Sequence, residues 1–130
     1  MTPGMYVTID ESDPRPIYVQ VAEEIRGLIA RGELAEGAPL PPVRQLAADL
    51  GVNLNTVANA YRELQGEGLV SIRHGAGASV ASRTARDKSE EELRRPLRAA
   101  LTGMVLAGLP RLEIMNLVQS ELRVLLKGAE

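Results

Sequence analysis

Residues 43–64 contain two short apolar stripes at helical spacing, with only a three-residue turn between them. The stripes are Val43, Leu46, Ala47 and Leu50, followed by Val57, Ala60, Tyr61 and Leu64. Gly51 ends the first because glycine tolerates the positive φ of a tight turn between helices, and Asn53 or Asn55 can cap the second. Ala47, Gly51 and Val57 have the offsets of a helix-turn-helix. The spacing therefore predicts this motif, although any compact pair of helices can show it.

The flanking segments extend this pair of helices into a larger unit. Tyr6–Ile9 has strand character, and the polar residues 10–16 are expected to form a loop. Apolar residues then recur at steps of three and four from Ile17 to Ile29 and predict a helix that ends at Gly32. Further on, Leu69–Arg73 and Ala78–Ala81 flank a glycine-bearing tip and predict a β-hairpin. Three helices followed by a two-stranded wing make a winged helix, whose third helix can enter the major groove of DNA.

A polar stretch at residues 82–90 lacks any apolar period and marks a boundary between two domains, 1–82 and 83–130. Beyond it, Ser89 and Glu92 form a capping box, and apolar residues continue at helical spacing from Leu93 to Val105. Pro96 lies inside this pattern, so it either kinks the helix or belongs to its first turn. Gly108 stops this helix and Pro110 opens another, which extends to about Lys127. The region is predicted to be a two-helix hairpin.

The apolar stripes of these two helices predict dimerisation. Two amphipathic helices cannot bury both stripes alone, whereas two copies make a four-helix arrangement. The residues expected at the dimer contact are Leu93, Leu97, Leu101, Val105, Ile114, Leu117, Val118, Leu122 and Leu125. The alternative is a small-molecule sensor, but two helices seldom enclose a pocket large enough for a ligand. The sequence identifies no effector.

The composition argues against several classes of protein. The 130 residues include no cysteine and a single histidine, so no disulfide framework, thiolate metal site or histidine-rich metal cluster is expected. The carboxylates are scattered along helix faces and offer no converging acid, base and nucleophile. No apolar run has the length of a membrane span, and no signal-peptide pattern opens the chain. We therefore expect a soluble, cytoplasmic protein that is not an enzyme and holds no metal or cofactor.

The net charge is unevenly distributed along the chain. Residues 1–82 hold six arginines and ten acidic residues, a net charge of −4, whereas residues 83–130 hold nine basic and seven acidic residues, a net charge of +2. Bulk charge therefore does not predict nucleic-acid binding, which must depend on local placement of cations. The acidic balance of residues 1–82 favours the alternative function, a winged helix that serves as a protein-interaction module without binding DNA.

Six short motifs in residues 16–81 keep a fixed order and spacing. They are Pro16-Ile17-Tyr18-x-Gln20, Gly32-Glu33-Leu34-x-x-Gly37, Leu40-Pro41-x-Val43-Arg44-Gln45-Leu46-Ala47, Leu50-Gly51-Val52-Asn53-x-Asn55-Thr56-Val57, Ala60-Tyr61-Arg62-Glu63-Leu64 and Glu67-Gly68-Leu69-Val70. Their combination resembles the GntR family of bacterial transcription regulators, and the Pro-Ile-Tyr opening and short helical tail resemble its YtrA-type subgroup. The resemblance implies a mainly α, winged helix-turn-helix regulator with a C-terminal two-helix dimerisation hairpin, expected to act as a homodimeric repressor on an inverted-repeat operator.

The resemblance also implies DNA contacts at individual residues of the helix-turn-helix. It places Arg44 at a base edge, where the planar guanidinium can bond guanine O6 and N7. It places Asn53, Asn55 and Thr56 at the start of the third helix, where family members contact phosphates or bases. Helix capping is an alternative role for these three side chains, and it can coexist with a phosphate contact.

Further contacts are implied on the third helix and at the wing. Asn59 lies one turn past Asn55 and can read adenine, and Arg62 can contact a phosphate; an exposed polar residue and an intrahelical pair are the respective alternatives. His74 and Gly75 match the wing tip, where a minor-groove or phosphate contact is expected.

Overall fold

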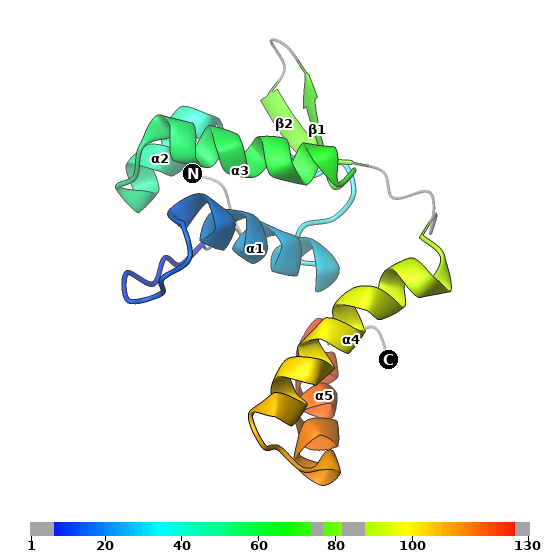
Figure 1. Cartoon of the computed structure of the whole chain (residues 1–130). Helices are drawn as coiled ribbons and strands as arrows, with labels where there is room; N and C mark the ends of the chain where they lie inside the picture. The colour runs from blue at the N-terminus through cyan, green and yellow to red at the C-terminus, as the bar shows by residue number, and fades with distance from the viewer. Residues whose placement is uncertain (1–6, 74–76, 82–87, 127–130) are drawn as a thin grey trace. The chain divides into compact units, whose positions relative to one another are not determined.

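The structure, a computed structural model, describes residues 7–73, 77–81 and 88–126 and divides into two compact units, Met1–Arg83 and Thr84–Glu130 (Figure 1). The first unit contains α1 (Ile17–Ala30), α2 (Val43–Leu50), α3 (Leu54–Gly66), β1 (Val70–Arg73) and β2 (Gly77–Val80). The second contains α4 (Glu90–Leu106) and α5 (Arg111–Leu125). The predicted fold class, a mainly helical winged helix-turn-helix followed by two C-terminal helices, is confirmed.

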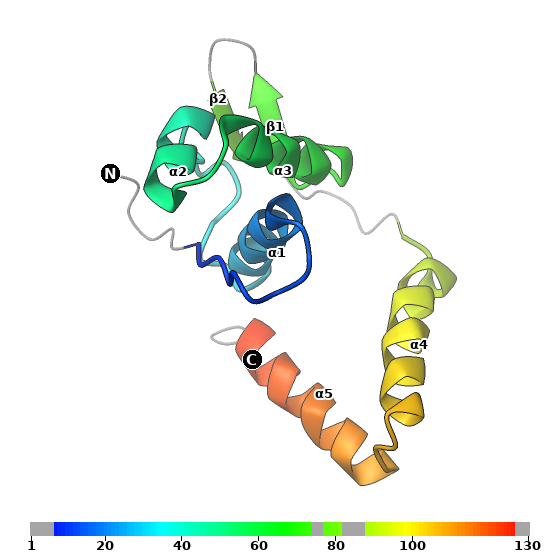
Figure 2. The same ribbon diagram turned by 60° about the vertical axis from the view of Figure 1, so that its left-hand side comes forward.

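The apolar faces of three helices form the core of the first unit. α1 and α2 both pack against α3 (Figures 1 and 2). The largest fully buried side chains are Val21, Ile25, Val57, Tyr61 and Leu64. Each such side chain contributes about 1.5–3 kcal/mol through its removal from water. The core is otherwise aliphatic, because the chain has no phenylalanine or tryptophan.

The wing is a two-stranded antiparallel hairpin with a third segment at its edge. Val70 pairs with Val80 and Arg73 pairs with Gly77, and both valines lie buried against the helices. An isolated bridge joins Pro39 to Ser79, and the Leu40 amide donates to the Ala78 carbonyl at 2.9 Å. The loop before α2 is thereby attached to β2, so the wing and the helix-turn-helix form one unit.

The loop before α1 is held by a buried glutamine rather than by strand pairing. Gln20 is 4% exposed; its Oε1 accepts from the Asp10 amide at 2.9 Å and its Nε2 donates to the Arg15 carbonyl at 3.2 Å. Residues 7–9 form no strand, so the strand character assigned to Tyr6–Ile9 is wrong for its described part. The reason is physical: Val7 and Ile9 pack on the core as part of a loop and have no neighbouring strand with which to pair.

The start of α4 resolves the ambiguity over Pro96. Ser89 and Glu92 form the predicted capping box, in which the Ser89 hydroxyl accepts from the Glu92 amide at 3.2 Å. The bond from the Ser89 amide to the Glu92 carboxylate holds the pKa of that carboxyl below its ordinary value. The helix therefore begins at Glu90, and Pro96 lies within it rather than in its first turn.

The two helices of the second unit diverge. Gly108, at φ 89°, ends α4, and Pro110 precedes α5. α4 and α5 then separate from this turn and make few contacts with each other (Figure 2). No residue in either helix is buried. Among the described residues, no helix is both long enough and apolar enough to span a membrane.

Candidate nucleic-acid interface

The turn between α2 and α3 sets the angle at which α3 is presented. Gly51 caps α2 in the left-handed conformation at φ 70°, and the Val52 amide donates to the Ala47 carbonyl at 3.0 Å. Asn53 then caps α3, because its side chain accepts from the Asn55 amide at 2.8 Å. Such a cap satisfies one of the free amides at a helix start and contributes about 1 kcal/mol. The first turn of α3 is therefore held rigidly against α2.

Tyr61 attaches α3 to the segment that precedes α2. Its ring is 2% exposed, and its hydroxyl donates to the Pro41 carbonyl at 2.6 Å. Burial raises the pKa of the Tyr61 phenol far above its ordinary value, so the group stays a neutral donor. This bond fixes the start of α2, where Arg44 lies, relative to α3.

The outer face of α3 is polar and open to solvent. Asn55, Asn59 and Arg62 are exposed, whereas Thr56 is half-buried beside the core. The Arg62 guanidinium donates to the side-chain oxygen of Asn59, so the two residues form a pair within the helix. Both Asn59 and Arg62 therefore stand on the face opposite the buried stripe of α3, as a groove-reading surface requires.

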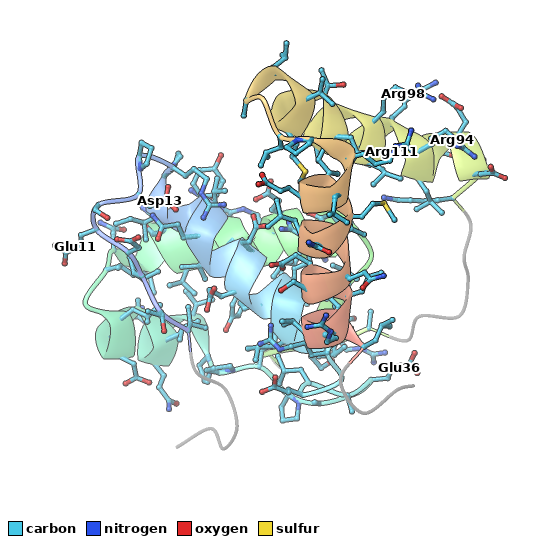
Figure 3. All side chains as sticks on the ribbon, turned by 90° about the horizontal axis from the view of Figure 1, so that it is seen from below. Glu11, Asp13, Glu36, Arg94, Arg98 and Arg111 are labelled. Carbon is cyan, nitrogen blue, oxygen red and sulfur yellow. The ribbon has the colours of Figure 1, made fainter. Side chains whose placement is uncertain are left out.

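The arginines that the structure describes in the first unit fall into two groups. Three of them, on and around α1, are neutralised by carboxylates: Arg15 by Asp13 and Glu23, Arg26 by Glu67, and Arg31 by Glu33. Figure 3 shows Asp13 and Glu11 on the loop before α1. The Arg15 guanidinium holds the pKa of the Asp13 carboxyl below its ordinary value.

The other three arginines that the structure describes in this unit are Arg44 on α2, Arg62 on α3 and Arg73 at the end of β1. All three are exposed, and none has an acidic partner among the residues that the structure describes. The acidic net charge of this unit therefore does not describe every part of its surface, because Arg15, Arg26 and Arg31 are paired with carboxylates and Arg44, Arg62 and Arg73 have no such pair among the described residues. Within the described part of the unit, the arginines without an acidic partner lie on the helix-turn-helix and the wing.

The sequence prediction omitted two residues of this surface and included two that lie outside the described part of the chain. Arg73 was not among the predicted DNA-binding residues, because its lack of an acidic partner among the described residues is visible only in the folded chain. Leu54, the first residue of α3, was also missed. His74 and Gly75, predicted to contact DNA from the wing tip, lie outside the described residues.

The predicted dimer residues lie on α4 and α5 without burial. Leu93, Leu97, Val105, Leu117, Leu122 and Leu125 are between 39% and 61% exposed, and Leu101, Ile114 and Val118 are half-buried. An apolar groove of about 460 Å³ runs between the two helices, lined by Leu97, Leu101, Val105, Ile114 and Val118 among others. Charged residues such as Arg94 and Arg98 occupy the first turns of α4 (Figure 3). Within the described part of the chain, no group of His, Asp or Glu could hold a metal ion.

The geometry defines a winged helix-turn-helix protein with a solvent-exposed third helix. Residues 17–80 match the family described as bacterial regulatory proteins, gntR family. YtrA from Sulfolobus acidocaldarius, a GntR-family transcription factor, is 40% identical with a TM-score of 0.62, and the match covers 74% of this chain and 97% of that one. A transcriptional antiterminator from Listeria monocytogenes EGD-e is 29% identical with a TM-score of 0.84, over 94% and 93% of the two chains. The chain belongs to the GntR family.

Other relatives refine this assignment. YtrA from Bacillus subtilis (strain 168), named an HTH-type transcriptional repressor, is 36% identical over 75 residues, or 58% of each chain. Together the two YtrA matches identify a YtrA-type member of the family. The AraR DBD in complex with operator ORE1 is 28% identical with a TM-score of 0.51, over 59% of this chain and 94% of that one. The chain spans 58% of the length of the Bacillus YtrA repressor and as little as 18% of the length of other curated relatives that it matches.

Proposed function

We propose that this chain is a sequence-specific DNA-binding transcription regulator, a repressor, that acts as a homodimer on an inverted-repeat operator. The observation that carries the proposal is the partition of the arginines. Among the described arginines, those on α2, α3 and β1 are exposed and have no acidic partner, while those on and around α1 are neutralised by carboxylates. Exposed cations without acidic partners, on the helix-turn-helix and the wing, are the electrostatic footprint expected of a nucleic-acid site.

The roles of the helix-turn-helix residues follow from their positions. Arg44, the second residue of α2, would reach a guanine edge, and Asn55 and Thr56 would contact phosphates or bases at the start of α3. The Asn53 oxygen caps the helix, so only its amide nitrogen is left to donate to a phosphate. Asn53 can therefore cap α3 with its oxygen and bind DNA with its nitrogen at the same time.

The remaining DNA contacts would come from the middle of α3 and from the wing. Asn59 would read adenine, and Arg62 would contact a phosphate after exchanging its bond with Asn59. Arg73 would add a phosphate contact beside the tip residues His74 and Gly75. The AraR operator complex supports this use of the fold, since its DNA-bound domain is similar to this chain.

Dimerisation through α4 and α5 is supported by their exposure. Two helices with no buried residue and a shared apolar groove gain stability only when another surface covers them. A second copy offers the same stripe, and a two-fold arrangement matches an inverted repeat. The repressor role is supported by the name of the Bacillus relative, and regulation of this kind would take place in the cytoplasm.

Selection from a pool of random duplexes tests the proposal directly. The chain should enrich an inverted repeat, and its affinity for the enriched duplex should fall steeply as salt rises, because phosphate contacts release counterions. Arg15→Ala is a matched control, since this arginine is already paired with Asp13 and Glu23 and should leave the selected sequence and affinity unchanged. No enrichment, together with no salt-dependent shift of any duplex, would refute the proposal and favour the protein-interaction module.

A further inference from the structure

An apolar side chain stands at the tip of the helix that is proposed to read DNA. Leu54 is the first residue of α3 and is 38% exposed, between the polar residues Asn53 and Asn55. In the described part of the first unit, the other large hydrophobic side chains of comparable exposure are Ile17, Tyr18 and Ile72. Of these four side chains, Leu54 alone lies on α3, among the polar residues that are proposed to meet DNA.

A second apolar residue lies on the same side of α3 as Leu54. Ala58 lies one turn further along, and residues four apart share a helix face. Ala58 is half-buried and lines a cleft of about 400 Å³ between α3, the segment before α2 and the wing, together with Val43, Ile72 and Ala78. Leu54 and Ala58 therefore give α3 an apolar flank over its first two turns. Further along the helix, Arg62 and Gln65 line the same cleft, and the outer face carries Asn55 and Asn59.

The major groove of DNA contains one kind of apolar group that Leu54 and Ala58 could contact. Each base pair presents hydrogen-bond donors and acceptors there, and only thymine adds a methyl group, at C5. A recognition helix contacts base edges with its N-terminal residues, which is where Leu54 and Ala58 lie. A leucine against a polar base edge would leave donors or acceptors of that base without water, whereas a leucine against a methyl group buries two apolar surfaces.

Resting on the proposed function, we propose that Leu54 and Ala58 determine specificity by packing on the C5-methyl groups of thymines in each half-site of the operator. Asn55, Asn59 and Arg44 hydrogen-bond neighbouring bases, so each half-site is read by two kinds of contact. The selected operator should then contain thymine at one or two fixed positions that face the start of α3.

Replacement of thymine by deoxyuridine isolates this contact, because it removes the methyl group and keeps every base-pairing and groove hydrogen bond. For the full chain on its selected operator, uracil at the contacted position should weaken binding about fourfold in one half-site and about 16-fold in both, as expected for the loss of one buried methyl group per half-site. Leu54→Ala should lower affinity for the thymine operator and reduce the uracil penalty to less than about twofold. Leu54→Met, which keeps a long apolar side chain, should retain the penalty.

The possible results separate the two proposals. If the chain enriches no duplex, the proposed function fails before this experiment begins. If it enriches an operator but no thymine shows a uracil penalty, or the penalty is unchanged in Leu54→Ala, the methyl contact is wrong while the proposed function stands. Asn55→Ala is the matched control, because it removes a polar neighbour and should leave the uracil penalty intact. Circular dichroism of each variant should match the parent chain, since Leu54 lies outside the core.

Discussion

Replacement of Arg62 by alanine should weaken binding to all DNA sequences alike and reduce the dependence of affinity on salt. Arg62 lies on the outer face of α3, is exposed, and has no acidic partner among the described residues. If it meets a phosphate, a dimer loses two phosphate contacts in the variant. Each contact contributes about 0.9 to the slope of log K against log salt, so the slope should become shallower by about 1.8.

This change in slope has a measurable consequence for affinity. Between about 50 and 200 mM salt, the ratio of parent to variant affinity should fall about 12-fold, which is well outside the error of a titration. Fluorescence anisotropy with the selected operator and with a scrambled duplex measures both slopes. The free energy of unfolding in urea should stay within about 0.5 kcal/mol of the parent, because an exposed side chain without a charged partner contributes little.

Arg15→Ala is the control of equal charge. Its guanidinium is bound to Asp13 at 2.7 Å and to Glu23 at 3.1 Å, on the α1 side of the unit. A purely global electrostatic effect would change both variants equally, whereas a local phosphate contact changes only Arg62→Ala. An unchanged slope in Arg62→Ala, or a loss confined to the operator, contradicts the assigned phosphate contact.

Three further predictions concern other parts of the molecule. Arg44→Ala should weaken specific binding by about 1–3 kcal/mol per half-site and relax the sequence preference at one base pair. If selection with the variant yields the same operator sequence and the same affinity as the parent chain, Arg44 reads no base. Truncation after Ser82 should leave a unit that is helical and unfolds cooperatively by circular dichroism. Its affinity for the operator should fall about 100-fold, because the two half-sites are no longer bound by linked domains. Equal affinity of the fragment and the full chain would show that α4 and α5 do not form the dimer contact. Tyr61→Phe should lower the free energy of unfolding measured in urea by about 1–2 kcal/mol, because the Pro41 carbonyl loses its donor. As a control, Tyr18→Phe at an exposed tyrosine should change it by less than about 0.5 kcal/mol. Equal effects of the two substitutions would be inconsistent with a buried hydrogen bond at Tyr61.

Much of the fold was predictable because its signals are local in the chain. The stripe of α3, the glycine at the end of α2 and the capping box of α4 each depend on residues within about one or two turns of one another. The strand assigned to Tyr6–Ile9 failed because an alternating pattern cannot report whether a neighbouring strand exists. The bridge between Pro39 and Ser79 and the bond from Tyr61 to Pro41 join residues far apart, so no local pattern announces them.

The candidate site was predictable only in part, because some of its properties depend on contacts between residues far apart in the chain. The helix-turn-helix spacing locates the second residue of α2 and the first turns of α3, and hence Arg44 and Asn55. It cannot tell which arginines are neutralised, because the pair of Arg26 with Glu67 spans 41 residues. The unpaired state of Arg73 and the exposure of Leu54 emerge only when the chain is folded.

We propose that two copies of this chain, joined through α4 and α5, present two α3 helices to one face of DNA. Sedimentation of the full chain with duplexes whose half-sites are separated by different numbers of base pairs tests this arrangement. Two chains should bind one duplex when the half-site centres lie about one helical turn apart, roughly 34–36 Å, and the complex should be lost when half a turn is inserted. Binding of one chain per duplex, or binding indifferent to the spacing, would contradict the claim.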